Sequence, residues 1–111
     1  MSIRRLKFCI NNEFRDSKTS KYMPVTNSST GEIIAETPCC TQDEVYEAIA
    51  AANAAFPAWS DMPVQKRVHI AIEIRNKIND HLEELAVICA TELGKTIDES
   101  RGDILKAIEV W

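Results

Sequence analysis

Residues 97–111 read IDESRGDILKAIEVW, and their apolar side chains recur with the period of an α-helix. The face that this pattern forms comprises Ile97, Arg101, Ile104, Leu105, Ile108 and Trp111. A helix commonly ends with a glycine or asparagine just past its last apolar residue, or with a proline soon afterwards. None of these follows the stripe, so we expect the chain to be truncated at Trp111 and to form the front part of a longer protein.

Three further helices are predicted upstream of this one. Thr41 and Glu44 form a capping-box pair, as do Thr96 and Glu99, and such side chains satisfy backbone N–H groups at the start of a helix. The helix that begins after Thr41 is expected to end or bend at Pro57, because proline has no N–H to donate.

The boundaries of the two middle helices follow from their flanking residues. Ser60 or Asp61 is predicted to cap the second helix, with Pro63 in its first turn. The apolar pattern breaks at residues 79–80, and a third helix then runs to Gly94, which suits a left-handed C-terminal cap.

Residues 1–40 have strand and turn chemistry instead. A two-residue turn at Asn11 and Asn12 is predicted to join two short strands, because asparagine tolerates the positive φ angles of such turns. A second turn over residues 27–31 is expected to join two further strands. The expected strand segments are residues 6–10, the residues around Phe14, residues 22–26 and residues 32–37, with Pro38 closing the last.

These patterns predict an α/β protein with an α+β arrangement in this segment. Residues 1–40 are expected to form β-hairpin ribbons, and residues 41–111 about four helices. A two-stranded ribbon is only marginally stable by itself in water. We therefore expect the ribbons and the apolar helix faces to be covered by protein that lies outside this chain.

Composition argues against several classes of partner. The net charge is −4 and the basic residues are scattered, which disfavours nucleic-acid binding. No apolar run approaches the ~20 residues that span a membrane, and the start of the chain lacks a signal-peptide core. The cysteines at positions 9, 39, 40 and 89 lack zinc-ligand spacing and are predicted to be reduced thiols of a cytoplasmic protein.

From the residue patterns, no side chain is predicted to be catalytic, to bind a cofactor or to ligate a metal. His69 and His81 have no compelling partners at metal-ligand spacing on the same helix face, so both are predicted to be structural. With three glycines, the chain contains neither a G-x-G-x-x-G turn nor a P-loop, and hence no visible phosphate cradle.

Three stretches taken together resemble a known family. They are LKFCINNEF at 6–14, NSSTGEIIAETP at 27–38, and a series from AAFPAW at 54–59 through ELGKT at 92–96 to RGDI at 101–104. In this order and spacing, roughly residues 6–111 resemble the N-terminal part of the NAD(P)-dependent aldehyde dehydrogenases. The resemblance implies that residues 41–111 are the helical part of a coenzyme-binding domain.

Within that superfamily, residues 92–110 look most like the methylmalonate-semialdehyde dehydrogenases. This resemblance implies an enzyme that oxidises a small acid semialdehyde with NAD and passes the acyl group to coenzyme A. It also implies that Lys106 helps to hold the substrate carboxylate, at a position where arginine is usual. Lysine supplies the charge but not the planar bidentate fork. The alternative for Lys106 is a solvent-facing side chain opposite Asp103.

In the family, a cysteine thiolate attacks the aldehyde carbonyl, and the motifs of the nucleophile and of the nucleotide site lie beyond the part that residues 6–111 resemble. None of the four cysteines matches the surroundings of that nucleophile. The chain is therefore expected to be non-catalytic by itself and to work with the remainder of a homo-oligomeric enzyme. Two alternatives stay open: a hydrolytic aldehyde dehydrogenase that releases the free acid, and a free-standing helical interaction module.

Overall fold

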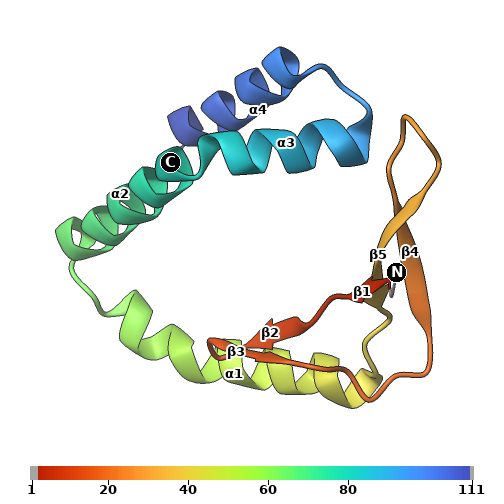
Figure 1. Ribbon diagram of the computed structural model, residues 1–111. Coiled ribbons are helices and arrows are strands. Elements are labelled where there is room, and N and C mark those ends of the chain that lie inside the picture. The colour runs from red at the N-terminus through yellow and green to blue at the C-terminus, as the bar shows by residue number, and fades with distance from the viewer. Residues whose placement is uncertain (1–2, 111) are drawn as a thin grey trace. The chain divides into compact units, whose positions relative to one another are not determined.

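The computed structural model of the chain describes residues 3–110 (Figure 1). The strands are β1 (Arg4–Arg5), β2 (Phe8–Ile10), β3 (Glu13–Arg15), β4 (Tyr22–Thr26) and β5 (Ile33–Pro38). The helices are α1 (Gln42–Ser60), α2 (Val64–Asp80), α3 (Leu82–Leu93) and α4 (Ile97–Val110). This order confirms the predicted β part followed by four helices. Trp111, the last member of the predicted stripe, lies outside the described residues.

The chain divides into two compact units. The first unit holds the residues up to 26 together with residues 32–61, and so contains all five described strands and α1. The second unit holds residues 27–31 and the residues from 62 onward, and so contains α2, α3 and α4.

The first unit contains a three-stranded sheet in the order β1-β5-β4. Strands β4 and β5 form the expected antiparallel hairpin, whereas β1 pairs with β5 in parallel. The prediction of two separate ribbons was incomplete, because Arg4 and Arg5 form a strand of their own. The Arg5 Nε atom lies 3.0 Å from Glu36 Oε2, and the Arg5 guanidinium lies over the Tyr22 ring at 4.5 Å from its centroid. These contacts with β5 and β4 hold β1 at the edge of this sheet.

The second sheet is the hairpin of β2 and β3, which Figure 1 shows along α1. Asn11 and Asn12 have φ angles of 53° and 64°, which confirms the predicted two-residue turn. Ile10 at the end of β2 is buried, and a groove beside it is lined by small residues of α1. These α1 residues are Ala48, Ala51, Ala52 and Ala55. Their small side chains allow the hairpin to approach the helix closely.

Helix α1 begins with the predicted capping box between Thr41 and Glu44. Of the two outcomes expected at Pro57, an end or a bend of the helix, the end does not occur, because α1 continues to Ser60. Proline removes one backbone donor, and the Pro57 carbonyl still accepts from the Asp61 N–H at 3.0 Å and from the Ser60 hydroxyl at 2.9 Å. These two hydrogen bonds to the Pro57 carbonyl therefore complete the last turn of α1.

Helix α2 starts differently from the prediction. Its N-cap is Pro63, and no side chain caps it, so neither Ser60 nor Asp61 has the predicted role. Both residues are used at the end of α1 instead. The Pro63 carbonyl accepts the first backbone hydrogen bonds of α2, from Lys66 N at 3.0 Å and Arg67 N at 3.2 Å.

Helix α3 ends as predicted at Gly94, whose φ of 72° is in the left-handed region that glycine favours. The end of α3 also contacts the turn of residues 27–31. The Ser28 N–H donates to the Thr91 carbonyl at 3.2 Å, and a Cβ atom at Gly94 would lie 3.2 Å from the Ser28 Cβ. Glycine at position 94 thus serves both the helix cap and the close approach of this turn.

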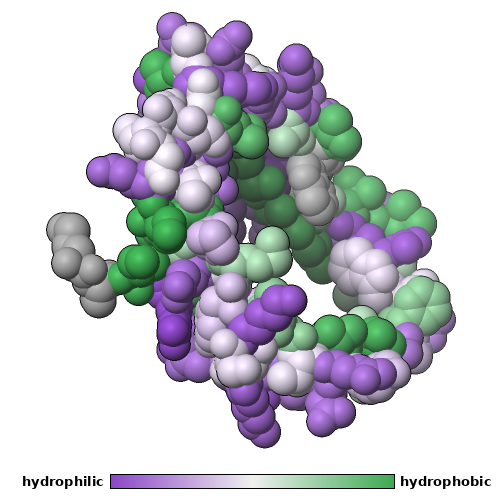
Figure 2. Space-filling view, turned by 90° about the vertical axis from the view of Figure 1, so that its right-hand side faces the viewer, coloured by the Kyte–Doolittle hydropathy of each residue, from purple (hydrophilic) through white to green (hydrophobic). Residues whose placement is uncertain are grey.

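Few apolar side chains are buried within the described residues. The buried ones are Ile10, Ala35 and Ala86, whereas large apolar side chains remain exposed on every helix, as the green surface areas in Figure 2 illustrate. Examples are Val45, Ile49, Phe56 and Trp59 on α1, Val64 and Val68 on α2, Val87 and Ile88 on α3, and Leu105 on α4. The apolar helix stripes are therefore largely open, in line with the sequence expectation. No helix in the described part of the chain is long and apolar enough to cross a membrane.

Glu44 is the one buried carboxylate among the described residues, at 7% exposure. It accepts from the Ser17 hydroxyl at 2.7 Å, from Lys18 N at 2.8 Å and from Thr41 N at 2.8 Å. Hydrogen bonds to the charged form favour ionisation, and they lower the pKa of Glu44 from 4.5 to about 2. The carboxylate thus fastens the loop before β4 to the start of α1.

We expect the Lys18 amide proton to report this low pKa. A folded-state pKa below the ordinary value means that the stabilisation from the Glu44 carboxylate is complete above about pH 5 and is lost only as the pH falls toward 2. In two-dimensional NMR spectra, the Lys18 amide shift should show no titration step between pH 6 and pH 3.5. A step near pH 4.5 would contradict the hydrogen bonds that residues 17–18 donate to the Glu44 carboxylate.

The matching substitution is Glu44→Gln, which should accelerate hydrogen exchange at the Lys18 amide because the charged acceptor is lost. Asp43→Asn is the control, since it removes an exposed carboxylate from the same first turn of α1. Equal acceleration in both variants would show that the negative charge in the first turn of α1, and not the hydrogen bond to Glu44, protects this amide.

Candidate functional site

The candidate site lies on α4, which carries Lys106. The helix starts with the predicted capping box, because Glu99 N donates to the Thr96 hydroxyl at 3.3 Å and Thr96 N donates to Glu99 Oε2 at 3.2 Å. Ser100 on α4 and Ala86 on α3 are both completely buried. These two small side chains allow α3 and α4 to pack side by side, as Figure 1 shows.

Arg101 holds α4 to α3 through charge. Its Nε and Nη2 atoms donate to the two Glu83 carboxylate oxygens, each at 2.8 Å, and its Nη1 donates to Asp98 at 2.7 Å. These bonds raise the pKa of Arg101 further above its ordinary value and lower that of Glu83. The sequence pattern placed Arg101 in the apolar stripe of α4. An arginine within such a stripe is itself a signal that an acid lies across the helix pair.

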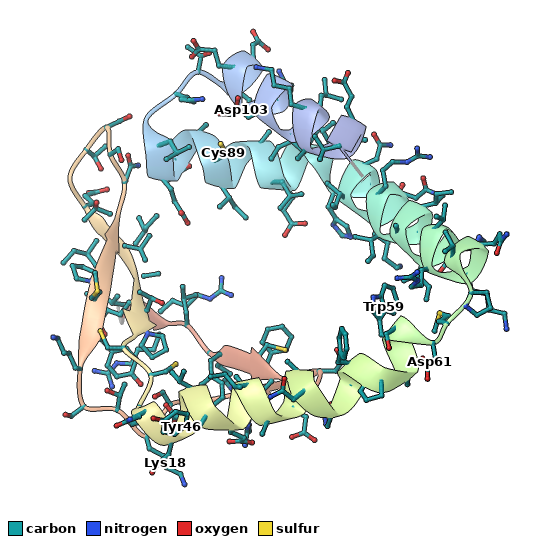
Figure 3. All side chains as sticks on the ribbon, turned by 180° about the vertical axis from the view of Figure 1, so that it is seen from behind. Lys18, Tyr46, Trp59, Asp61, Cys89 and Asp103 are labelled. Carbon is teal, nitrogen blue, oxygen red and sulfur yellow. The ribbon has the colours of Figure 1, made fainter. Side chains whose placement is uncertain are left out.

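The next acid of α4, Asp103, is paired with a residue outside the helix. Lys95, in the connection between α3 and α4, donates to the Asp103 carboxylate, and this bond lowers the pKa of Asp103 and raises that of Lys95. Figure 3 labels Asp103 on α4 and Cys89 on the neighbouring α3. The sequence had suggested Lys106 as the residue opposite Asp103.

Lys106 is exposed on α4, one helical turn after Asp103. Within residues 3–110, no hydrogen bond or ion pair joins Lys106 to another residue. Its ammonium group is therefore available to an anionic partner.

The two histidines lie at the surface of the second unit. His69 Nε2 is 3.4 Å from Glu73 and His81 Nδ1 is 3.1 Å from Glu84, and all four side chains are more than 60% exposed. Over residues 3–110, no group of three or more His, Cys, Asp or Glu side chains is arranged to hold a metal ion. The histidines thus make ordinary surface contacts within α2 and at the start of α3.

The four cysteines are free thiols, as composition predicted. Cys9 is exposed and Cys39, Cys40 and Cys89 are half-buried. In the hollow beside the start of α1, Arg15 Nη2 donates to Glu47 at 2.6 Å and Glu44 accepts from Ser17, whereas the buried Arg15 Nε atom has no hydrogen-bond partner among the described residues. Neither feature adds a second candidate site to that of Lys106.

Comparison with known proteins finds one family along most of the chain. The model of the aldehyde dehydrogenase family matches residues 14–111. The methylmalonate-semialdehyde/malonate-semialdehyde dehydrogenase [acylating] of Dictyostelium discoideum is 38% identical over 104 residues, which are 94% of this chain and 20% of that protein. Malonate-semialdehyde dehydrogenase 2 of Oceanobacillus iheyensis is 37% identical over 97% of this chain and 22% of its own length.

Solved structures show the same relationship. A putative methylmalonate-semialdehyde dehydrogenase from Sinorhizobium meliloti, solved with NAD, is 28% identical over 98% of this chain, with a TM-score of 0.92. Aldehyde dehydrogenase 21 from Physcomitrella patens, solved with the product succinate, gives 27% identity over 98% of this chain and a TM-score of 0.87. The chain spans about a fifth of the length of these relatives. On the family match over residues 14–111 and this shared fold, the chain belongs to the aldehyde dehydrogenase family.

Proposed function

We propose that this chain forms the N-terminal part of an NAD-dependent enzyme that oxidises malonate semialdehyde or methylmalonate semialdehyde to an acyl-coenzyme A. The observation that carries the proposal is the 38% and 37% identity to dehydrogenases named for these substrates, over nearly the whole chain. The ammonium group of Lys106, which has no hydrogen-bond or ion-pair partner among residues 3–110, supports it, because both substrates carry a carboxylate.

In this proposal Lys106 binds the carboxylate end of the substrate and leaves the aldehyde end to other residues. A protonated lysine is a point charge with three donors, so it attracts a carboxylate without dictating one planar geometry. Helix α4 keeps the side chain in place, because the buried Ser100 and the fork of Arg101 on Glu83 hold the helix against α3.

NAD and coenzyme A are assigned to the complete enzyme. When bound, NAD accepts the hydride of the aldehyde and coenzyme A takes the acyl group. The three glycines of this chain lie in the turn of residues 27–31, at the end of α3 and inside α4, so they form no phosphate-binding turn. The residues described here therefore do not fit a dinucleotide site. We also propose that the complete enzyme is a homo-oligomer.

Replacing Lys106 with alanine in the enzyme that carries this chain should raise KM for malonate semialdehyde about tenfold or more, because a charge-assisted hydrogen bond to the substrate is lost. The KM for propanal, which has no carboxylate, should stay unchanged. Steady-state kinetics with the two aldehydes give the comparison.

Lys106→Arg is the matched control, since it keeps the charge and adds a bidentate fork, and it should retain or improve KM for the acidic aldehyde. An equal loss with both aldehydes in Lys106→Ala would remove Lys106 from substrate recognition.

Coenzyme A dependence separates the acylating enzyme from the hydrolytic alternative. We expect NADH formation from malonate semialdehyde to need coenzyme A and to yield an acyl-coenzyme A, which mass spectrometry detects. Full activity without coenzyme A, with free acid as the product, would favour the hydrolytic class.

A thermal melt of the purified chain tests whether it works as a segment of that enzyme or as a free-standing interaction module. With Ile10, Ala35 and Ala86 as the buried apolar residues of the described part, we expect a broad transition by circular dichroism. A sharp, cooperative melt of a monomer would favour the module.

A further inference from the structure

The connection between α3 and α4 places a second lysine near the helix turn that carries Lys106. Lys95 directly follows the glycine that ends α3, and its ammonium group donates to the carboxylate of Asp103, eight residues later on α4. The side chains of Lys95 and Asp103 are 42% and 38% exposed, so this pair lies at the surface and close to solvent.

Lys106 is a second possible ion-pair partner of Asp103. Asp103 and Lys106 are three residues apart on α4, and residues at this spacing face each other on a helix. Helical side chains also lean toward the N-terminus, which directs the stem of Lys106 back over the turn of Asp103. The charge of Lys106 contributes less to the low pKa of Asp103 than the charge of Lys95 does. Without Lys95, Asp103 would be free to bind Lys106.

The position one helical turn before Lys106 also lacks close neighbours. Gly102 precedes Lys106 by four residues, and a Cβ atom at Gly102 would meet nothing within 4 Å. Glycine inside a helix is less stable than alanine, and packing within the described chain does not require it here. The described residues thus leave room for a side-chain atom at position 102, one turn before Lys106.

We propose that Lys95 is a positioning residue for Lys106: by holding the Asp103 carboxylate, it keeps the Lys106 ammonium group free to bind the carboxylate of the substrate. This inference rests on the proposed function of Lys106. It adds that Lys95 sets the preference for acidic aldehydes from outside α4, by removing a competing internal anion.

A purely structural role for Lys95 makes a different prediction. If the pair with Asp103 only fastened the α3–α4 connection, breaking it from either side would have the same effect. If Lys95 instead neutralises a competitor of the substrate, loss of Lys95 is harmful, whereas loss of the Asp103 charge is harmless or favourable.

Lys95→Met in the enzyme that carries this chain should raise KM for malonate semialdehyde about two- to fivefold, because a surface pair of Asp103 with Lys106 then competes with the substrate. The KM for propanal should not change. Asp103→Asn should leave KM for malonate semialdehyde unchanged or lower it, and Lys95→Met/Asp103→Asn should return KM to the level of the parent enzyme.

Three variants serve as controls. Lys95→Arg keeps the charge at position 95 and should behave like the parent enzyme. Lys66→Met removes the same charge from an exposed position of α2 and should leave both KM values unchanged. Glu109→Gln removes the acid three residues after Lys106, which stands in the less favourable order for a helical pair.

The inference is overturned if Lys95→Met leaves KM for malonate semialdehyde unchanged, if Asp103→Asn is as damaging as Lys95→Met, or if the double variant is not rescued. A selective effect of Lys106→Ala combined with any of these results leaves the proposed function in place and removes Lys95 alone. A Lys106→Ala variant without selectivity would overturn the function of Lys106 itself and the role of Lys95 with it.

Discussion

The close packing of α3 against α4 decides where the charged groups of the second unit lie. Ser100 and Ala86 are completely buried, and small side chains such as these let two helices approach closely. At that distance Arg101 reaches both oxygens of Glu83, and the short connection after Gly94 brings Lys95 to Asp103. Lys106 forms no hydrogen bond or ion pair with another described residue, and Asp103, one turn before it, is paired with Lys95. The candidate site is thus Lys106, the lysine that the ion pairs between α3 and α4 leave unpaired among the described residues.

The first unit is organised by a single buried carboxylate. Glu44 combines the capping of α1 with two hydrogen bonds to the loop of residues 17–18, so one side chain joins the strand region to the helix. A buried charge is tolerated when several donors surround it, and the low pKa of Glu44 follows from those donors. In both units, polar contacts hold the elements together where few apolar side chains are buried.

Local signals in the sequence predicted most of the elements. The capping boxes of Thr41 and Thr96, the left-handed Gly94 and the Asn11-Asn12 turn are set by a few neighbouring residues, and the structure confirms each. The error at the start of α2 came from competition between neighbouring elements, because Ser60 and Asp61 close α1 and are then not available to cap α2. Strand β1 was missed because its partner is β5, about thirty residues away, and two arginines in a row give no periodic pattern.

The sequence by itself determined the order of the elements, the caps and turns that bound them, and the resemblance to the aldehyde dehydrogenases that the family match confirms. These features depend on residues that are close along the chain or on a pattern carried by the whole segment. Only the tertiary structure decided which charges pair. The sequence offered a solvent-facing Lys106 opposite Asp103 as one alternative, and the fold pairs Asp103 with Lys95 because the end of α3 brings that lysine to the first turns of α4. Spacing along a helix defines which pairs are possible, and the packing of neighbouring elements selects among them.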